Sequence, residues 1–504
     1  MHDENKTSIS VLKFMARFLP LLIIPIVLVF SISKIFSEKQ FEENIPAHYF
    51  TSYLDSRIKE LMDIYEIPGA TIALIKGGET VWVQAYGYAD LETGRKMTVD
   101  TYVRVQSISK PVTAWGIMKL VEQGKIDLDS PVKHYIKNWK FPDSEFSEEK
   151  ITIRQLLSHS AGMPLGDFYN YYSPKGDIPT LEASLTKEAV LIKDPGLSFS
   201  YSNTGFNLLE LLIEEVAGRD FAEFMQDEVL VPLEMQDSSF EWRETLQPAV
   251  PFGYDLNGKA VPVYVYPEKG SGGLFSTVGD IATFLIAGMP GFTQNQHVLK
   301  PRSIDQLYTP MITGLGVYDL VFDSYGLGYY LEDLSNGKQA VSHGGQGTGW
   351  MTHFHCVPES GDGIVILTNS QRSWPFIANI LSDWSEWNGF SPIGMSRIII
   401  GQKILWAIVG LIWVIVFWHL WILAEGIFSK KLEFSPLSKK SRFLRLMQLF
   451  WFICITIVLL WCINQDYLFI SSVFPIVSIW LGWTLMALAF VSLLLAMFPK
   501  KGFG

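Results

Sequence analysis

Apolar residues are concentrated at the two ends of the chain. Near the C-terminus, three apolar stretches each approach the roughly 20 residues that a helix needs to cross the hydrocarbon core of a bilayer. They lie at about residues 404–424, 446–463 and 473–498. A shorter apolar stretch, Phe18–Ile32, follows a basic start. The pattern predicts three transmembrane helices within residues 404–504, and a signal anchor or signal peptide in residues 1–36.

The region between these ends, residues 45–395, has the mixed pattern of a domain that folds in water. Phe50–Tyr65 carries apolar residues at helical spacing. The next segment alternates like two strands joined at Gly77-Gly78. Helical spacing returns from Ser107 to Gln123, so the domain begins with a helix, a hairpin and a second helix.

Strand patterns return in the last part of this domain, after helices and long loops that continue to about residue 319. Four segments show them: YGLGYYLED, QAVSHGG, WMTHFHCV and GIVILTN. A helix at Phe376–Trp387 closes the domain. Strands at both ends with helices between them predict an α+β fold. Its sheet is assembled from distant parts of the chain, and the helical middle is an insertion.

Composition and flanking charge agree with a membrane protein. The 504 residues are 48% hydrophobic and include 16 Trp, more than soluble domains usually need. Basic residues fill the loop between the first two C-terminal stretches and follow the last one: Lys430, Lys431, Lys439, Lys440, Arg442, Arg445, Lys500 and Lys501. Because basic loops stay in the cytoplasm, we expect a multi-pass protein with a cytoplasmic C-terminus and an extracytoplasmic domain at residues 45–395.

Charge and cysteine content argue against nucleic-acid binding and against disulfide bonds in the domain. The chain has a formal net charge of −11 although both ends are basic, so the acidic excess lies in the middle. An acidic domain argues against nucleic acid as a partner. Of the three cysteines, Cys454 and Cys462 lie in a predicted span, which leaves Cys356 alone outside the membrane. The domain therefore has no disulfide framework.

A candidate nucleophile lies at the start of the second predicted helix. Ser-x-x-Lys spacing occurs eight times in the chain, including one Ser-Ile-Ser-Lys at Ser31 and another at Ser107, so spacing alone identifies no site. Ser107 would stand at a helix N-terminus, where unpaired N–H groups and the helix dipole favour developing negative charge. Lys110, one turn later, could accept the hydroxyl proton if burial makes its amine neutral. The alternative is that Ser107 only caps the helix.

Tyr201-Ser202-Asn203 provides a second element of such a site. It lies in a loop that runs directly into a helix, and it is the only Tyr-x-Asn in the chain. A tyrosine beside a lysine can be shifted toward phenolate and act as a general base. The amide of Asn203 can orient both the lysine and a substrate carbonyl. Tyr201 could equally be a packed ring with a satisfied hydroxyl.

A third element is the strand segment His343-Gly344-Gly345-Gln346. Glycines within a strand allow another backbone or a ligand to approach closely. We expect a substrate to lie against this strand, with the Gln346 N–H as an oxyanion donor and His343 supplying a hydrogen bond or a charge near the leaving group.

With these three segments in order, the domain resembles the serine β-lactamase and penicillin-binding-protein superfamily, nearest its class C β-lactamase and D-aminopeptidase branch. Three further phrases resemble that branch in the same order: ITIRQLLSHSAGMP from Ile151, GSGGLFSTVGDIATFL from Gly270 and YGLGYYL from Tyr325. The resemblance implies an antiparallel sheet flanked by helices, with a mostly helical insertion. It also implies a serine hydrolase that acts through an acyl-enzyme, without metal or cofactor.

The resemblance also assigns roles to residues. It implies Ser107 as the acylated nucleophile, Lys110 and Tyr201 as proton-transfer partners and Asn203 as a substrate-orienting residue. The N–H groups of Ser107 and Gln346 would form the oxyanion hole. His343 occupies the place where relatives have the lysine of Lys-Thr-Gly, a motif absent from this chain.

This departure leaves the substrate open. A histidine weakens the fixed positive charge that would bind the carboxylate of a β-lactam or a peptide. Relatives with this substitution include esterases and D-amino-acid amidases. The interpretation is a membrane-bound hydrolase of an amide or ester in a D-amino-acid peptide, a cell-wall-type peptide or a peptide prodrug. An esterase or β-lactamase is the alternative.

The layout resembles that of membrane-bound D-amino peptidases of the colibactin-maturing type, which also carry three C-terminal spans after an external catalytic domain. An exporter or the cell-wall machinery is a candidate partner for the spans. Two other hypotheses remain. The domain could be a sensor that binds peptides without turnover, or His353 and His355, which share one face of a strand, could bind a metal.

Overall fold

The structure is a computed structural model of the 504-residue chain. It describes residues 45–166, 170–244, 246, 249–292, 296–390, 392–436, 442–465 and 468–501. The predicted signal segment, residues 1–36, lies outside them. The described residues fall into two compact units that divide between Arg397 and Ile398.

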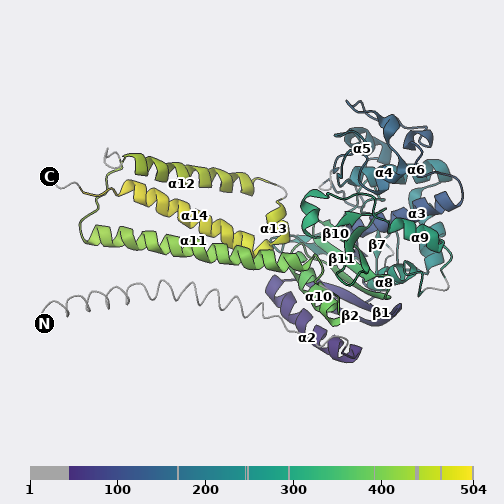
Figure 1. The fold of residues 1–504 in the computed structure, drawn as a ribbon, viewed down its shortest axis with the longest axis horizontal. Helices are drawn as coiled ribbons and strands as arrows, with labels where there is room; N and C mark the ends of the chain where they lie inside the picture. Colours follow the sequence, from purple (N-terminus) through teal and green to yellow (C-terminus); the bar gives the residue numbers. More distant parts are fainter. Residues whose placement is uncertain are drawn as a thin grey trace. The chain divides into compact units, whose positions relative to one another are not determined.

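The first unit is built on an eight-stranded antiparallel sheet in the order β3-β2-β1-β12-β11-β10-β9-β8. Figure 1 labels β1, β2, β10 and β11 of this sheet. The strands are β1 Gly69–Lys76, β2 Glu79–Asp90, β3 Arg95–Lys96, β8 Ser324–Tyr325, β9 Tyr330–Asp333, β10 Gln339–Gly347, β11 Trp350–Val357 and β12 Asp362–Thr368. Strand β1 pairs with β12, with Leu74 opposite Ile364. The predicted assembly of one sheet from distant parts of the chain is confirmed.

The predicted hairpin forms between β1 and β2. Gly77 and Gly78 have φ angles of 59° and 77°. Two consecutive positive φ angles are what a tight two-residue hairpin turn requires, and glycine adopts them without steric cost.

Helices cover both faces of the sheet. On one face, α2 (Ala47–Tyr65) packs against α10 (Trp374–Trp387), where the rings of Phe50 and Trp387 stack 4.3 Å apart. On the other, α8 (Val278–Ala287) brings Phe284 to within 6.5 Å of the Phe354 ring of β11. Because side chains alternate along a strand, His353 and His355 face α10 instead.

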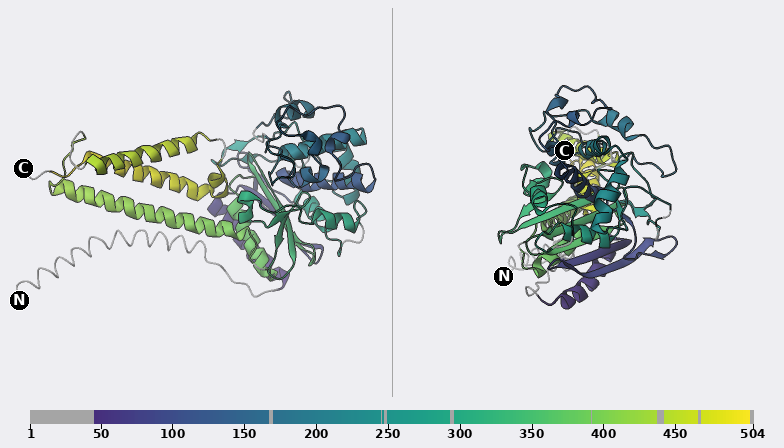
Figure 2. Two further views of the ribbon diagram at one scale, coloured as in Figure 1. Left: turned by 45° about the horizontal axis from the view of Figure 1, so that its top comes forward. Right: turned by 90° about the vertical axis from the view of Figure 1, so that its right-hand side faces the viewer.

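The middle of the chain forms the predicted helical insertion, which gathers on one side of the sheet (Figure 2). Its helices are α3 Ser109–Glu122, α4 Ile153–Leu157, α5 Leu181–Glu188, α6 Asn203–Ala217, α7 Phe221–Met225 and α9 Pro301–Leu307. Two small strand pairs accompany them: β4 Val103–Arg104 with β7 Phe275–Ser276, and β5 Gly253–Tyr254 with β6 Ala260–Val261. The α+β fold class is therefore confirmed.

Within the described part of the chain, three helices are long and apolar enough to cross a membrane: α11 Ser396–Phe428, α12 Arg442–Ile463 and α14 Pro475–Met497. A short helix, α13 Phe469–Val473, precedes the last. Helix α12 packs against α14. At one end Arg445 donates from Nε to the carbonyl of Ala496, at 2.6 Å, so a cation satisfies a free carbonyl where α14 ends.

Candidate active site

The candidate nucleophile, Ser107, lies in a three-residue 3₁₀ turn, η1 (Gln106–Ile108), which leads directly into α3. Gln106 has a φ of +55°, an unusual conformation for a residue with a side chain. Neighbouring hydroxyls hold the turn: Thr352 Oγ1 donates to the Val105 carbonyl at 2.7 Å, and Ser109 Oγ donates to that of Gln106 at 2.6 Å. Strained backbone of this kind persists only where the surroundings determine it, which is common at active sites.

Strand β10 lies directly beside this turn. A Cβ atom at Gly345 would meet the Val105 carbonyl oxygen, Thr352 Oγ1 and Gln106 Cβ, and a Cβ at Gly347 would meet the Gln106 side chain. The glycines therefore allow the expected close approach, and the approaching group is the turn that carries Ser107. Gly344 faces away from the turn, toward Trp374 of α10.

Lys110 is fully buried on the first turn of α3 and has three oxygens around its amine. Its Nζ lies 2.7 Å from Asn203 Oδ1, 2.8 Å from the Ser271 carbonyl oxygen and 3.1 Å from Ser107 Oγ. Burial holds the pKa of Lys110 well below its usual value. A neutral amine has two N–H donors, which the two acceptor-only oxygens take. Its lone pair is then directed at the Ser107 hydroxyl, the geometry of a general base.

The Tyr201-Ser202-Asn203 segment is held at the N-terminus of α6. Ser202 Oγ caps the helix by accepting the N–H of Gly205 at 2.8 Å, and it donates to the Pro164 carbonyl. The buried His159 accepts the Ser202 N–H on Nδ1 at 3.1 Å. Tyr201 and Asn203 are thereby fixed on either side of a capped helix start, next to Lys110.

The protonation of Tyr201 differs from the expectation. Burial raises its pKa above the usual value of a tyrosine, although a hydrogen bond with Ser107 lowers it in part. The Lys110 amine lies 5.0 Å from the ring centre, but it loses its own charge through burial and so does not favour a phenolate. Tyr201 is therefore a neutral phenol that can donate a proton, and the predicted shift toward phenolate is wrong for this state.

His343 also differs from the expectation of a charged or hydrogen-bonding group at the leaving group. It has no exposed surface, and burial lowers its pKa to about 3. Its Nδ1 lies 2.8 Å from the Gly344 carbonyl and must donate to it. Nε2 therefore accepts from the Tyr325 hydroxyl at 3.2 Å. Both ring nitrogens are occupied and the ring is neutral.

Gln346, one residue beyond the glycine pair, turns its side chain to the opposite side of the strand. Its Oε1 accepts the indole N–H of Trp374 at 2.9 Å. The side chain is thus fixed on α10, and only the backbone of this position can face the turn of Ser107. That agrees with the expectation that an N–H group, and not the amide side chain, serves the oxyanion. The role itself stays a prediction.

Several residues around the site carry no motif and were missed. The Ser271 carbonyl binds Lys110, and it belongs to the phrase from Gly270 that the sequence singled out only as a family signature. Gln106 Nε2 donates to the Tyr264 hydroxyl at 3.0 Å, and this hydroxyl donates to the Thr348 carbonyl at 3.1 Å. Such backbone and long-range contacts leave no periodic signal in a sequence.

Arg104, three residues before Ser107, supports the same region as a buried cation. It is 2% exposed and donates to the carbonyls of Gly272 and Tyr264. Its guanidinium lies 4.8 Å, 5.0 Å and 4.5 Å from the ring centres of Tyr264, Tyr266 and Phe275. Aromatic faces stabilise a desolvated guanidinium, which anchors the backbone leading into the turn.

The alternative hypothesis is that His353 and His355 bind a metal ion. Among the described residues, no group of three His, Cys, Asp or Glu side chains could hold a metal ion. His353 and His355 lie 5.8 Å apart by ring centres and are buried. Burial raises the pKa of the Cys356 thiol to about 12, which argues against a reactive thiolate.

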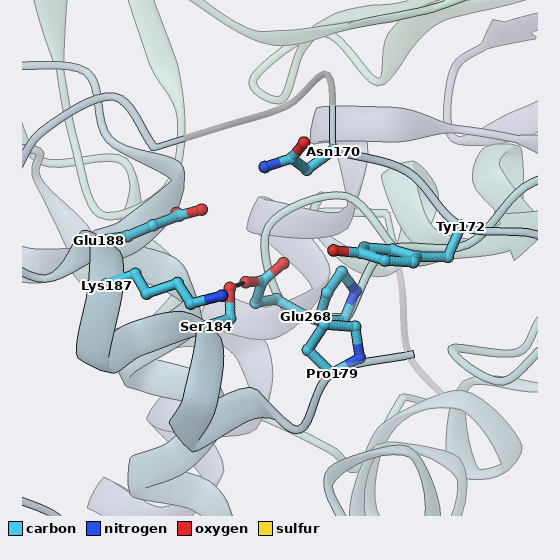
Figure 3. Close-up of a pocket in the computed structure, with 8 residues that line it drawn as sticks. Asn170, Tyr172, Pro179, Ser184, Lys187, Glu188 and Glu268 are labelled. Carbon is cyan, nitrogen blue, oxygen red and sulfur yellow. Dashed lines mark hydrogen bonds between the residues drawn. The ribbon is translucent and has the colours of Figure 1, made fainter. Parts of the chain in front are cut away.

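A small cavity of about 40 Å³ lies within the helical insertion (Figure 3). Its lining includes Ser184, which donates to the Glu268 carboxylate, together with Lys187 and Tyr172. None of the predicted site residues lines it. Its volume suits a water molecule and excludes a peptide.

The antiparallel sheet carries a serine and a buried lysine at the start of α3, with a Tyr-x-Asn at the start of α6. This is the arrangement expected of the β-lactamase and penicillin-binding-protein type. The chain belongs to the Beta-lactamase family, whose match covers residues 54–383. The expected family is therefore confirmed.

Relatives agree with this assignment. The chain is 26% identical over 329 residues to Protein flp of Staphylococcus aureus (strain MRSA252), covering 63% of this chain and 62% of that protein. It is 23% identical over 356 residues to Penicillin-binding protein 4* of Bacillus subtilis (strain 168), covering 64% and 74%. The structure is similar to the octameric penicillin-binding protein homologue from Pyrococcus abyssi, with a TM-score of 0.56 and 29% identity, covering 66% and 77%.

Proposed function

We propose that the domain hydrolyses an amide or ester bond of a D-amino-acid peptide or peptide-like substrate through an acyl-enzyme on Ser107. The observation that carries the proposal is the environment of Lys110. Two acceptor oxygens take its N–H groups, and its lone pair faces Ser107 Oγ at 3.1 Å. A complete proton-transfer arrangement favours turnover over the alternative of a sensor that only binds.

In the proposed reaction, Ser107 Oγ forms a bond to the substrate carbonyl carbon while its proton passes to Lys110. The N–H groups of Ser107 and Gln346 stabilise the resulting oxyanion. Tyr201 donates its proton to the leaving amine or alkoxide and recovers it from Lys110. Water then attacks the acyl group, its proton passes to the same base, and Ser107 leaves with a proton.

Fluorophosphonate labelling of the full-length protein tests this proposal. The Ser107→Ala variant should lose all labelling, because it removes the hydroxyl that lies 3.1 Å from the buried amine of Lys110. Ser147→Ala is the matched control: Ser147 begins another Ser-x-x-Lys with Lys150, but it is exposed and should leave labelling unchanged. Equal labelling of Ser107→Ala and the unaltered protein would exclude Ser107 as the nucleophile.

The neutral, buried His343 supports substrates that carry no carboxylate at this position. A fixed cation is what a β-lactam or a free peptide C-terminus needs there, and His343 has neither charge nor a free donor. Esters and blocked peptides fit better, so esterase activity is the second candidate. Hydrolysis of labelled penicillin at the rate of an aminoacyl ester would contradict this assignment.

The layout supports a more specific substrate: an acyl-D-amino-acid prodrug of the kind processed by colibactin-maturing peptidases. It also supports a catalytic domain outside the cytoplasmic membrane, with an exporter or the cell-wall machinery as the partner. Both proposals depend on the three apolar C-terminal helices that follow the domain. Deletion of residues 404–504 should abolish prodrug cleavage in cells while purified protein still cleaves a soluble ester.

A further inference from the structure

Glu210 is a carboxylic acid placed where helix α6 should be apolar. It is 1% exposed and lies within the run Leu208-Leu209-Glu210-Leu211-Leu212 on the buried side of the helix. A carboxyl group in a protein core is unfavourable unless its hydrogen bonds are made. Its partners therefore identify what it does.

Both partners belong to the segment that reaches Lys110. Glu210 Oε2 accepts the backbone N–H of Lys269 at 2.6 Å and that of Gly270 at 2.7 Å. One oxygen thus fixes two consecutive peptide groups. Burial raises the pKa of Glu210 to about 8, so the group is mostly a neutral acid at pH 7 and accepts through its carbonyl oxygen.

The same segment is tied to α3 from its other side. Thr113 Oγ1 donates to the Gly270 carbonyl at 2.8 Å, and the next carbonyl, that of Ser271, accepts from Lys110 Nζ at 2.8 Å. A Cβ atom on Gly270 would lie 3.0 Å from the Phe206 carbonyl and 3.1 Å from Glu210 Cβ. The segment is therefore held tightly between α3 and α6.

We propose that Glu210 is a positioning residue for the proton transfer from Ser107. It fixes the Ser271 carbonyl, which takes one N–H of Lys110 and so directs the lone pair of the amine at Ser107 Oγ. This inference rests on the proposed function. It assigns a role in the chemical step to a residue that touches neither Ser107 nor Lys110.

The test compares fluorophosphonate acylation of Ser107 in full-length Glu210→Gln, Glu210→Leu and Glu214→Leu proteins. Glutamine keeps the accepting oxygen, so its maximal acylation rate should stay within twofold of the unaltered protein. Leucine removes the acceptor and should lower this rate at least tenfold, with the half-saturating probe concentration unchanged. A lost orientation affects the chemical step and not probe binding.

Glu214→Leu is the matched control. Glu214 lies one turn further along α6, and its Oε1 accepts the N–H of Phe221 at 3.0 Å, a peptide group outside the segment of Lys269, Gly270 and Ser271 that reaches Lys110. Its loss should lower the melting temperature and leave the acylation rate within twofold. Equal rates in Glu210→Leu and Glu214→Leu would overturn the inference, whereas Ser107→Ala decides the proposed function independently.

If Glu210→Leu does not fold, Thr113→Val replaces it. Valine has the shape of threonine but cannot donate to the Gly270 carbonyl, so it loosens the same segment from the α3 side. The maximal acylation rate should fall three- to tenfold. An unchanged rate in this variant would overturn the inference.

Discussion

Gly345 faces the turn that carries Ser107, and the turn lies so close that any side chain at position 345 would displace it. The atoms that a Cβ would meet include the Val105 carbonyl, a backbone atom that cannot swing away. The position of the Ser107 turn therefore depends on the missing Cβ at Gly345, which leaves room for the turn beside β10.

We predict that Gly345→Ala lowers the acylation rate at least a hundredfold and destabilises the protein by about 1–3 kcal/mol, because overpacking shifts the backbone. The matched control is Gly279→Ala in α8, where the nearest atom to a new Cβ is Thr277 Oγ1 at 3.9 Å. It should leave the rate unchanged and raise helix propensity. Labelling kinetics measure the acylation rate of each variant, and thermal unfolding measures its stability. An unchanged acylation rate in Gly345→Ala would contradict the role of this glycine in placing the Ser107 turn.

Residue types in the motifs could be predicted from the sequence, but their charge states could not. Ser107, Lys110, Tyr201 and Asn203 come together as expected. The neutral state of His343 and the protonated phenol of Tyr201 follow from tertiary burial, which local sequence does not reveal. Glu210 did leave a signal, as an acid inside a run of leucines.

Helix α6 shows how an element sets the site. Its N-cap, Ser202, lies between the two site residues Tyr201 and Asn203, and one hydroxyl both caps the helix and bonds the Pro164 carbonyl. The hydrogen bonds of Ser202 thus fix both the start of the helix and the positions of Tyr201 and Asn203.

We predict that Ser202→Ala costs about 1 kcal/mol of stability, as loss of an N-cap usually does, and also lowers the acylation rate at least tenfold. Thr180→Ala is the control, since Thr180 caps α5 by accepting the Ala183 N–H at 3.2 Å, away from the site. It should lose similar stability and keep its rate. Parallel loss of rate in both variants would show that stability alone is responsible.

Element boundaries were predicted best where local chemistry decides them. The hairpin at Gly77-Gly78 and the end of α3 before Gly124, with a φ of +68°, follow from glycine conformations. The predicted helix from Ser107 begins two residues later, because contacts with β10 and β11 hold Ser107 in a 3₁₀ turn. Helix α11, Ser396–Phe428, is longer than the predicted span at about residues 404–424 and contains it.

At the scale of the molecule, the distribution of basic residues predicts a topology that reporter fusions can test. Alkaline phosphatase, active only outside the cytoplasm, should be inactive when fused after residue 436 and active after residue 464. It should be inactive again at the C-terminus. A green fluorescent protein series should give the complementary pattern. The reverse pattern in both series would place the hydrolase domain in the cytoplasm.

The pairing of β1 with β12 has a consequence for biogenesis. Leu74 of β1 pairs with Ile364 of β12. During synthesis, roughly 290 residues are therefore added after β1 before its partner strand exists. A contact between residues so far apart in the sequence slows folding. During this interval β1 and β2 can form only an isolated hairpin, which is marginally stable in water. The nascent domain is consequently exposed to proteases and to aggregation until β12 has been synthesised. The hairpin at the start of the domain is thus the segment that a chaperone would protect.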